Sequence, residues 1–152
     1  MDRDMDKYEA FENEMTGKFP EMFSKPYGGF AVGEGWWPIL KELCSQINSY
    51  TKWRNGTREA LLKDNPYDHE IPDAIPQVVV AQVKEKFGGL RFYYDGGDRH
   101  ISGMVRMAET WASHTCETCG KPGTIRHGGW IRTLCDEHEE ERQQQMKERF
   151  AK

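Results

Sequence analysis

The sequence predicts an α+β protein with N-terminal helices, a central antiparallel β-hairpin or small sheet with a packing helix, and a small Cys/His-containing module at the C-terminus. Apolar side chains recur at helical spacing in the first third of the chain and again after its middle. Between them, β-branched and aromatic residues flank Gly88-Gly89, a strong signal of a tight hairpin turn. Two Cys/His pairs follow within residues 116–138. We expect a body over residues 1–113 and a module over residues 114–152.

The composition is typical of a folded domain rather than a disordered or membrane-spanning chain. Of the 152 residues, 37% are hydrophobic and 12% are aromatic, which is enough for a modest core. No window approaches 18 consecutive apolar residues, so no membrane span is expected. Residues 1–4 are charged and lack the apolar stretch of a secretory signal, so we expect a cytoplasmic location.

Charge is distributed unevenly along the chain. The formal net charge is −4, yet residues 84–133 carry eight basic and five acidic side chains. A globally acidic protein is a poor candidate for non-specific duplex DNA binding, because that binding depends on neutralising phosphates. A basic centre between acidic ends is compatible with a small anionic ligand or a defined protein surface.

The N-terminal third is predicted to contain helices joined by a loop. A first helix is expected over residues 4–16, where apolar side chains follow the helical period. Residues 25–35 are rich in glycine and proline and predict a loop. A second helix should begin near Trp37, because Pro38 is tolerated in the first helical turn.

This second helix is expected to stop before Asn55-Gly56, a pair typical of turns. A separate short helix over residues 57–63, capped by Thr57, would follow. Residues 65–76 contain three prolines and predict a loop that leads into the hairpin.

The hairpin is predicted to carry a basic face. With the two glycines at the turn, Lys86 would oppose Arg91 and Lys84 would oppose Tyr93, and alternation places all four on one face. Directly opposed cations are unfavourable, and an anion held between the three cations would explain them. The alternative is a solvated basic face that protects an edge strand.

The opposite face of the hairpin is predicted to be apolar apart from Glu85. An unpaired carboxylate is costly there, and Arg106 on the next helix is a candidate partner. That helix is expected over residues 99–114, with Asp98 as its N-cap and an apolar stripe that packs on the hairpin.

Three of the four cysteines have the spacing of metal ligands. Cys116 and Cys119 form a C-x2-C pair, Cys135 and His138 form a C-x2-H pair, and fifteen residues separate the pairs. Zn²⁺ prefers four sulfur and nitrogen ligands in a tetrahedron, so we predict that these four residues hold a structural Zn²⁺. Cys44 lies at a helical core position and is expected to be a small buried apolar residue.

With these two ligand pairs, the segment over about residues 114–150 resembles a treble-clef zinc finger. The resemblance implies a zinc knuckle, a hairpin over residues 124–134 and a terminal helix that begins near Cys135. Four ligands close the coordination sphere, so no catalysis is expected at the metal. Such modules serve nucleic-acid binding, protein binding, nuclease chemistry or stability alone, so the motif predicts local fold better than function.

Several motifs together resemble a family of small, functionally uncharacterised proteins encoded by bacteriophages, prophages and bacteria. They are GWWPIL from residue 35, QVKEKFGGLRFYY from residue 82, MAE from residue 107 and the two metal-ligand segments. The resemblance covers about residues 33–140 and implies an accessory protein that acts in a bacterial host cell. By analogy, such a protein would counter host antiviral defence by binding a defence protein or sequestering a phosphate-bearing nucleotide signal.

The side chains favour a non-enzymatic binding protein. The candidate ligand-binding residues combine rings that could stack on bases with cations that could hold phosphates: Trp36, Trp37, Tyr93, Lys84, Lys86 and Arg91. A zinc-dependent nucleic-acid-binding protein is the second hypothesis, and a metal-dependent nuclease is the third. No Ser–His–Asp, P-loop or paired-carboxylate motif supports an enzyme. A homodimer formed through the exposed C-terminal helix is a further hypothesis.

Overall fold

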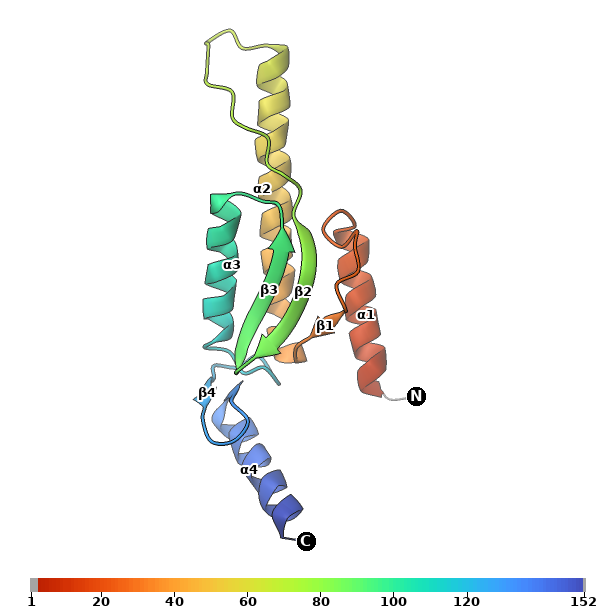
Figure 1. Ribbon diagram of the computed structural model, residues 1–152, viewed down its shortest axis with the longest axis vertical. Helices are drawn as coiled ribbons and strands as arrows, with labels where there is room; N and C mark the ends of the chain where they lie inside the picture. The colour runs from red at the N-terminus through yellow and green to blue at the C-terminus, as the bar shows by residue number, and fades with distance from the viewer. Residues whose placement is uncertain (1–2, 152) are drawn as a thin grey trace.

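The computed structural model describes residues 3–151 and confirms the α+β class. Its elements are α1 (Arg3–Lys18), β1 (Phe30–Ala31), a 3-10 turn (Glu34–Trp36), α2 (Trp37–Lys63), β2 (Val79–Lys86), β3 (Gly89–Asp95), α3 (Arg99–Ala112), β4 (Thr124–Arg126), β5 (Arg132–Leu134) and α4 (Asp136–Phe150). The strand order is β1-β2-β3 in the main sheet, and β4 pairs with β5 in a second, smaller sheet. The small sheet and α4 lie at one end of the body (Figure 1).

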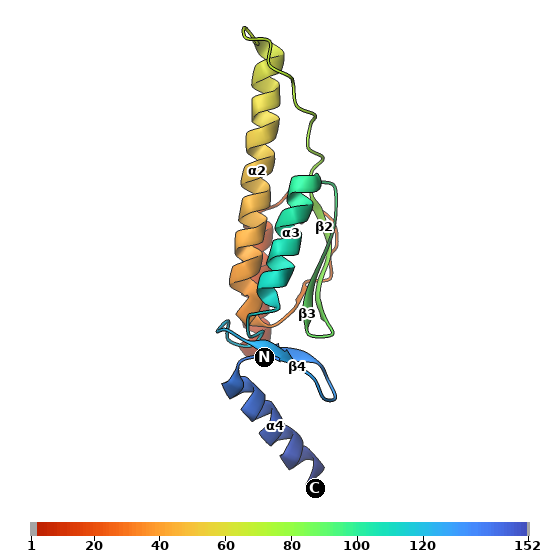
Figure 2. The same cartoon turned by 90° about the vertical axis from the view of Figure 1, so that its left-hand side faces the viewer.

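The hydrophobic core lies between the main sheet and the helices. Helices α2 and α3 lie side by side on one face of the sheet (Figure 2). The fully buried residues of the core come from the main sheet and from both helices, and they include Leu40, Ile47, Val80, Val83, Leu90 and Ile101. Helix α1 adds Phe11 and Met15 to the same core. Within residues 3–151, no helix combines the length and the apolar character needed to cross a membrane.

The prediction that α2 stops before Asn55 is wrong, because a single helix runs over Trp37–Lys63. The Asn55 side chain accepts the N–H of Ile75 at 2.8 Å and donates to its carbonyl oxygen at 3.2 Å. The amide is therefore satisfied by the returning loop and does not compete with the helix backbone. Arg58 donates to the carbonyl of Pro72 at 2.7 Å in the same way. The second half of α2 projects beyond the sheet with this loop beside it (Figure 1).

The hairpin turns one residue earlier than predicted. Phe87 and Gly88 form the turn, with φ of 52° and 80°, as a two-residue turn with two positive φ angles requires. Lys84, not Lys86, therefore opposes Arg91, and Gln82, not Lys84, opposes Tyr93, so both predicted pairs are offset by two residues. Because an offset of two leaves each side chain on its original face, the predicted basic face is preserved.

The other elements differ little from expectation. The unpredicted β1 is a two-residue strand that pairs in parallel with β2 within the segment predicted as a loop. Helix α3 begins after Asp98, whose side chain accepts the N–H of Ile101 at 3.0 Å, as expected of an N-cap. Helix α4 covers the predicted range, and none of its residues is buried.

Candidate functional site

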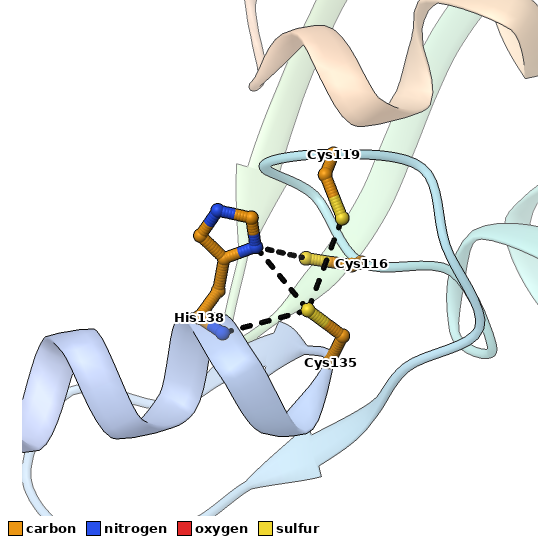
Figure 3. Close-up of side chains that lie close together, drawn as sticks. All are labelled: Cys116, Cys119, Cys135 and His138. Carbon is orange, nitrogen blue, oxygen red and sulfur yellow. Dashed lines mark hydrogen bonds between the residues drawn. The ribbon is translucent and has the colours of Figure 1, made fainter.

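The four predicted metal ligands meet where the small sheet joins α4 (Figure 3). One ligand atom from each of Cys116, Cys119, Cys135 and His138 lies within 4.8 Å of all the others. The Sγ atoms of Cys119 and Cys135 are 3.8 Å apart, and His138 Nδ1 lies 3.7 Å from Cys116 Sγ and 3.2 Å from Cys135 Sγ. Ligands at tetrahedral zinc bond lengths would be separated by about 3.3–3.8 Å. The cluster could therefore hold a metal ion and fits a structural zinc.

Local backbone geometry positions each ligand. Gly120, with a φ of 82°, turns the chain after Cys119 and donates its N–H to the Cys116 carbonyl at 2.9 Å. Cys135 is the N-cap of α4, and its Sγ accepts the N–H of His138 at 3.5 Å. The second ligand pair therefore lies on the first turn of α4, as predicted.

Backbone donors favour the thiolate at Cys116. Burial raises the pKa of this thiol, but N–H groups of Cys135, Cys119 and Thr118 outweigh burial and lower the pKa to about 6. The thiolate is the form that binds a metal. Cys44 differs, because burial raises its pKa to about 12 and it lies in the hydrophobic core. The prediction that Cys44 is a buried core residue is confirmed.

The segment that begins at Cys116 is in direct contact with the loop that precedes α2. The N–H of Gly35 donates to the Glu117 carbonyl at 2.8 Å, and the N–H of Gly33 donates to Glu117 Oε2 at 2.8 Å. A Cβ atom added at Gly35 would lie 2.1 Å from the carbonyl oxygen of Cys116. The two backbones are thus too close for any side chain at Gly35, and contacts cross the predicted boundary between residues 113 and 114.

The two tryptophans that were predicted to stack on a ligand both pack against other parts of the protein. Trp36 is fully buried and donates its Nε1–H to the carbonyl of Thr115 at 2.8 Å. Trp37 is half-buried and stacks on Phe11, with ring centroids 4.5 Å apart and planes at 4°. Both rings pack within the protein, so the structure does not support the prediction that Trp36 and Trp37 bind a ligand together with the hairpin cations.

The remaining predicted ligand-binding residues do share a face of the hairpin. Lys86 and Tyr93 are exposed, and Lys84 and Arg91 are half-buried. Lys84 Nζ lies 5.8 Å from the Tyr93 ring centroid, whereas Arg91 Nη1 lies 3.2 Å from the position of a Cβ at Gly89. The opposed charges therefore diverge along the strands, and no anion is needed to separate them. This outcome favours a solvated basic face.

A groove of about 590 Å³ lies between β1, the hairpin and α4. Its apolar wall includes Phe30, Trp130, Met146 and Phe150, and its polar lining includes Glu85, Glu117, Arg132 and Arg149. None of the predicted ligand-binding residues lines it. A sequence signal for it exists on α4, where residues 142, 146 and 149 are spaced i, i+4 and i+7 and share a helix face.

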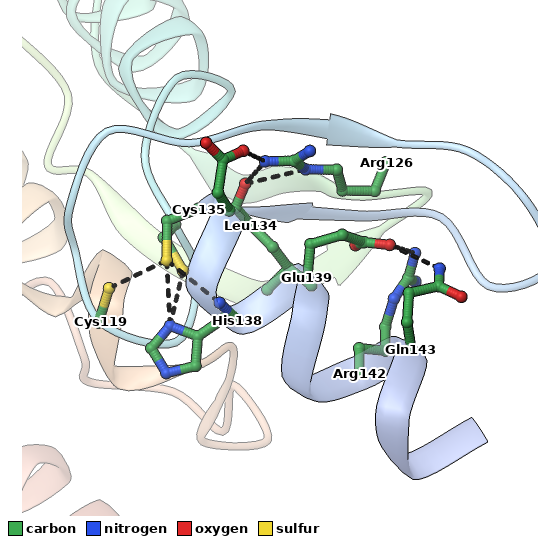
Figure 4. A network of polar contacts seen from close by, with 10 residues as sticks. Cys119, Arg126, Leu134, Cys135, His138, Glu139, Arg142 and Gln143 are labelled. Atoms are coloured by element: carbon green, nitrogen blue, oxygen red, sulfur yellow. Dashed lines mark hydrogen bonds and ion pairs between the residues drawn. The ribbon is translucent and has the colours of Figure 1, made fainter. Parts of the chain in front are cut away.

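A polar network attaches the first turns of α4 to the small sheet (Figure 4). Arg142 donates to the Trp130 carbonyl and, at 3.0 Å, to Glu139 Oε1. Arg126 donates to Asp136 Oδ1 at 2.7 Å on the first turn of α4. Arg142 and Arg126 therefore hold the helix against the β4–β5 hairpin at two points.

Glu85 lies at the opposite wall of the groove. Its Oε2 accepts the N–H of Gly88 at 2.7 Å, so the turn satisfies this oxygen, and the predicted partner Arg106 does not. Its Oε1 accepts no hydrogen bond from the part of the chain that the structure describes. Glu85 therefore offers one free acceptor to the groove.

Comparison with protein-family models, curated proteins and solved structures found no match. Fold and site alone define the class: an α+β protein whose C-terminal Cys3His cluster could hold a metal ion next to an open groove.

Replacing Gly35 with alanine is expected to destabilise the fold, because the new methyl group would overlap the Cys116 carbonyl oxygen. We expect the free energy of unfolding to fall by at least about 2 kcal/mol in urea titrations. Gly56→Ala is the matched control, since no atom lies within 4 Å of a Cβ in the middle of α2. That variant should be as stable as the parent or more stable by up to about 1 kcal/mol. Equal stability of the two variants would contradict the close approach.

Proposed function

We propose that the Cys3His cluster binds one structural Zn²⁺. Three thiolates and an imidazole are soft and borderline donors, which Zn²⁺ accepts and hard cations such as Mg²⁺ do not. Four protein ligands leave no open position for a substrate, so the ion would stabilise rather than catalyse. Its role would be to fix the start of α4 to the Cys116–Cys119 knuckle, which itself contacts the body.

We also propose that the chain is a non-enzymatic binding protein. The observation that carries this proposal is the open groove of about 590 Å³, which combines aromatic and cationic side chains beside a closed metal cluster. Its volume falls within the range of about 300–1,000 Å³ that is usual for small-molecule sites. This size favours a phosphate-bearing nucleotide over a host protein as the ligand.

The setting of this binding function comes from the sequence resemblance. Small phage-encoded accessory proteins act in the bacterial cytoplasm, where sequestering a nucleotide signal would counter antiviral defence. A zinc-dependent nucleic-acid-binding protein is the second candidate. It is favoured by the exposed Lys86 and the half-buried Lys84 and Arg91, which share one face of the hairpin.

Metal analysis tests the first proposal. The purified protein should contain one zinc per chain, and His138→Ala should lose most of it because one of four ligands is removed. His127→Ala is the control, since His127 is exposed and lies outside the cluster. Chelation should lower the free energy of unfolding of the parent protein. Folded protein without metal, or equal zinc loss in both variants, would contradict a structural Zn²⁺ at this cluster.

Titration calorimetry with a product assay tests the second proposal. The zinc-loaded protein should bind at least one of ATP, GTP, CTP and UTP, and chromatography should recover the nucleotide unchanged after prolonged incubation. Native mass spectrometry of the same sample reports bound nucleotide and the number of chains in the complex. Conversion of the nucleotide to product would contradict a non-enzymatic role. Salt-sensitive binding of DNA without nucleotide binding would favour the second candidate.

A further inference from the structure

We propose that the groove between β1, the hairpin and α4 is the binding site, and that it takes a nucleotide with its phosphates at Arg149, its base against Trp130 and a base amino group at Glu85. This inference rests on the proposed binding function and adds the place, the orientation and the base preference of the ligand. It moves the site from the predicted basic hairpin face to a groove that the sequence analysis did not identify.

The α4 side of the groove offers a free cation. Arg142 is already engaged by Glu139 and the Trp130 carbonyl. Arg149 lies two turns further along the same helix face, is exposed, and makes no hydrogen bond or ion pair with the residues that the structure describes. A guanidinium binds phosphate oxygens through two parallel hydrogen bonds, so Arg149 is suited to a phosphate. Arg132, 3.6 Å from Glu117, is a second cation at the groove.

Two exposed aromatic rings line the same groove as this cation. Trp130 and Phe150 both line the groove, and each leaves 76% of its surface exposed. The Arg142 side chain donates a hydrogen bond to the Trp130 carbonyl and so ties the Trp130 backbone to α4 beside the groove. An exposed indole ring on a backbone that is fixed in this way offers a surface on which a base can stack.

The far wall of the groove carries the opposite charge. Both Glu117 oxygens are engaged, one by the Gly33 N–H and one by Arg132, whereas Glu85 keeps Oε1 as a free acceptor. A nucleotide matches this polarity, since its base offers N–H donors and its other end offers phosphate. An acidic peptide or inorganic pyrophosphate would instead place negative charge near Glu85 and would leave its Oε1 without a hydrogen-bond donor.

The carboxylate predicts which bases bind. Carboxylate oxygens accept a hydrogen bond from the exocyclic amino group of cytosine, but they repel the carbonyl oxygen that uracil carries at the same position. CTP and UTP are otherwise nearly equal in size and charge, so they form a matched ligand pair. The site should prefer CTP to UTP, and ATP and GTP also offer an amino group.

The experiment is calorimetric titration of the full-length, zinc-loaded protein with ATP, GTP, CTP and UTP, each compared with its nucleoside. Arg149→Glu should weaken nucleotide binding at least tenfold, while Lys147→Glu, the same charge change on α4 outside the groove, should change it less than twofold. Trp130→Ala should also weaken binding at least tenfold. Trp53→Ala, which removes an exposed tryptophan of α2, should not. Glu85→Gln should reduce the preference for CTP over UTP.

Other outcomes overturn the proposal in distinguishable ways. If the parent protein binds nucleotides but Lys84→Glu or Arg91→Glu abolishes binding and Arg149→Glu does not, the binding function stands and the groove is the wrong site. If UTP binds as tightly as CTP, the orientation toward Glu85 is wrong. If only single-stranded oligonucleotides bind, or none of these probes binds the zinc-loaded protein, both the groove proposal and the nucleotide function are rejected.

Discussion

The close contact between the loop before α2 and the Cys116–Glu117 backbone is the constraint on which the rest of the structure depends. The contact is possible only because Gly33 and Gly35 have no side chain: a Cβ at either position would lie within 2.4 Å of a carbonyl oxygen. Both glycine N–H groups are satisfied by Glu117, through its backbone and its carboxylate. Burial raises the pKa of that carboxyl, although the Gly33 N–H and Arg132 oppose the rise. Separating the two segments would leave these polar groups unpaired, so they fold as one unit.

The Cys3His cluster, which could hold a metal ion, extends this unit to α4. No residue of α4 is buried, and a helix that buries no apolar face gains little stability from packing. Its position therefore depends on the Cys135 and His138 ligands at its first turn and on the two arginines that brace it against the small sheet. The groove shares this dependence, since α4 supplies one of its walls. A metal that stabilises the fold would in this way also shape the binding site.

Features of the sequence that depend on local geometry were predictable, and those that depend on distant partners were not. C-x2-C and C-x2-H spacing and alternation along a strand are local, so the meeting of the four Cys and His side chains and the shared face of the hairpin cations were predictable. The hairpin turn was misplaced because Phe87 takes a positive φ that usually favours glycine or asparagine. The continuity of α2 depends on Asn55 and Ile75, and the burial of Trp36 depends on Thr115, partners that the sequence does not reveal. The groove was missed because its walls come from segments far apart in the chain.

Hydrogen exchange at the Gly35 amide, with and without metal, tests most directly whether the ion and the body form one unit. The N–H of Gly35 donates to Glu117, directly beside the ligand Cys116. Our account predicts strong protection of this amide in the zinc-loaded protein. Removing the metal should abolish that protection together with the protection of α4, while the amides of β2 and β3 stay protected. Unchanged protection of Gly35 and α4 after complete metal removal would contradict the account.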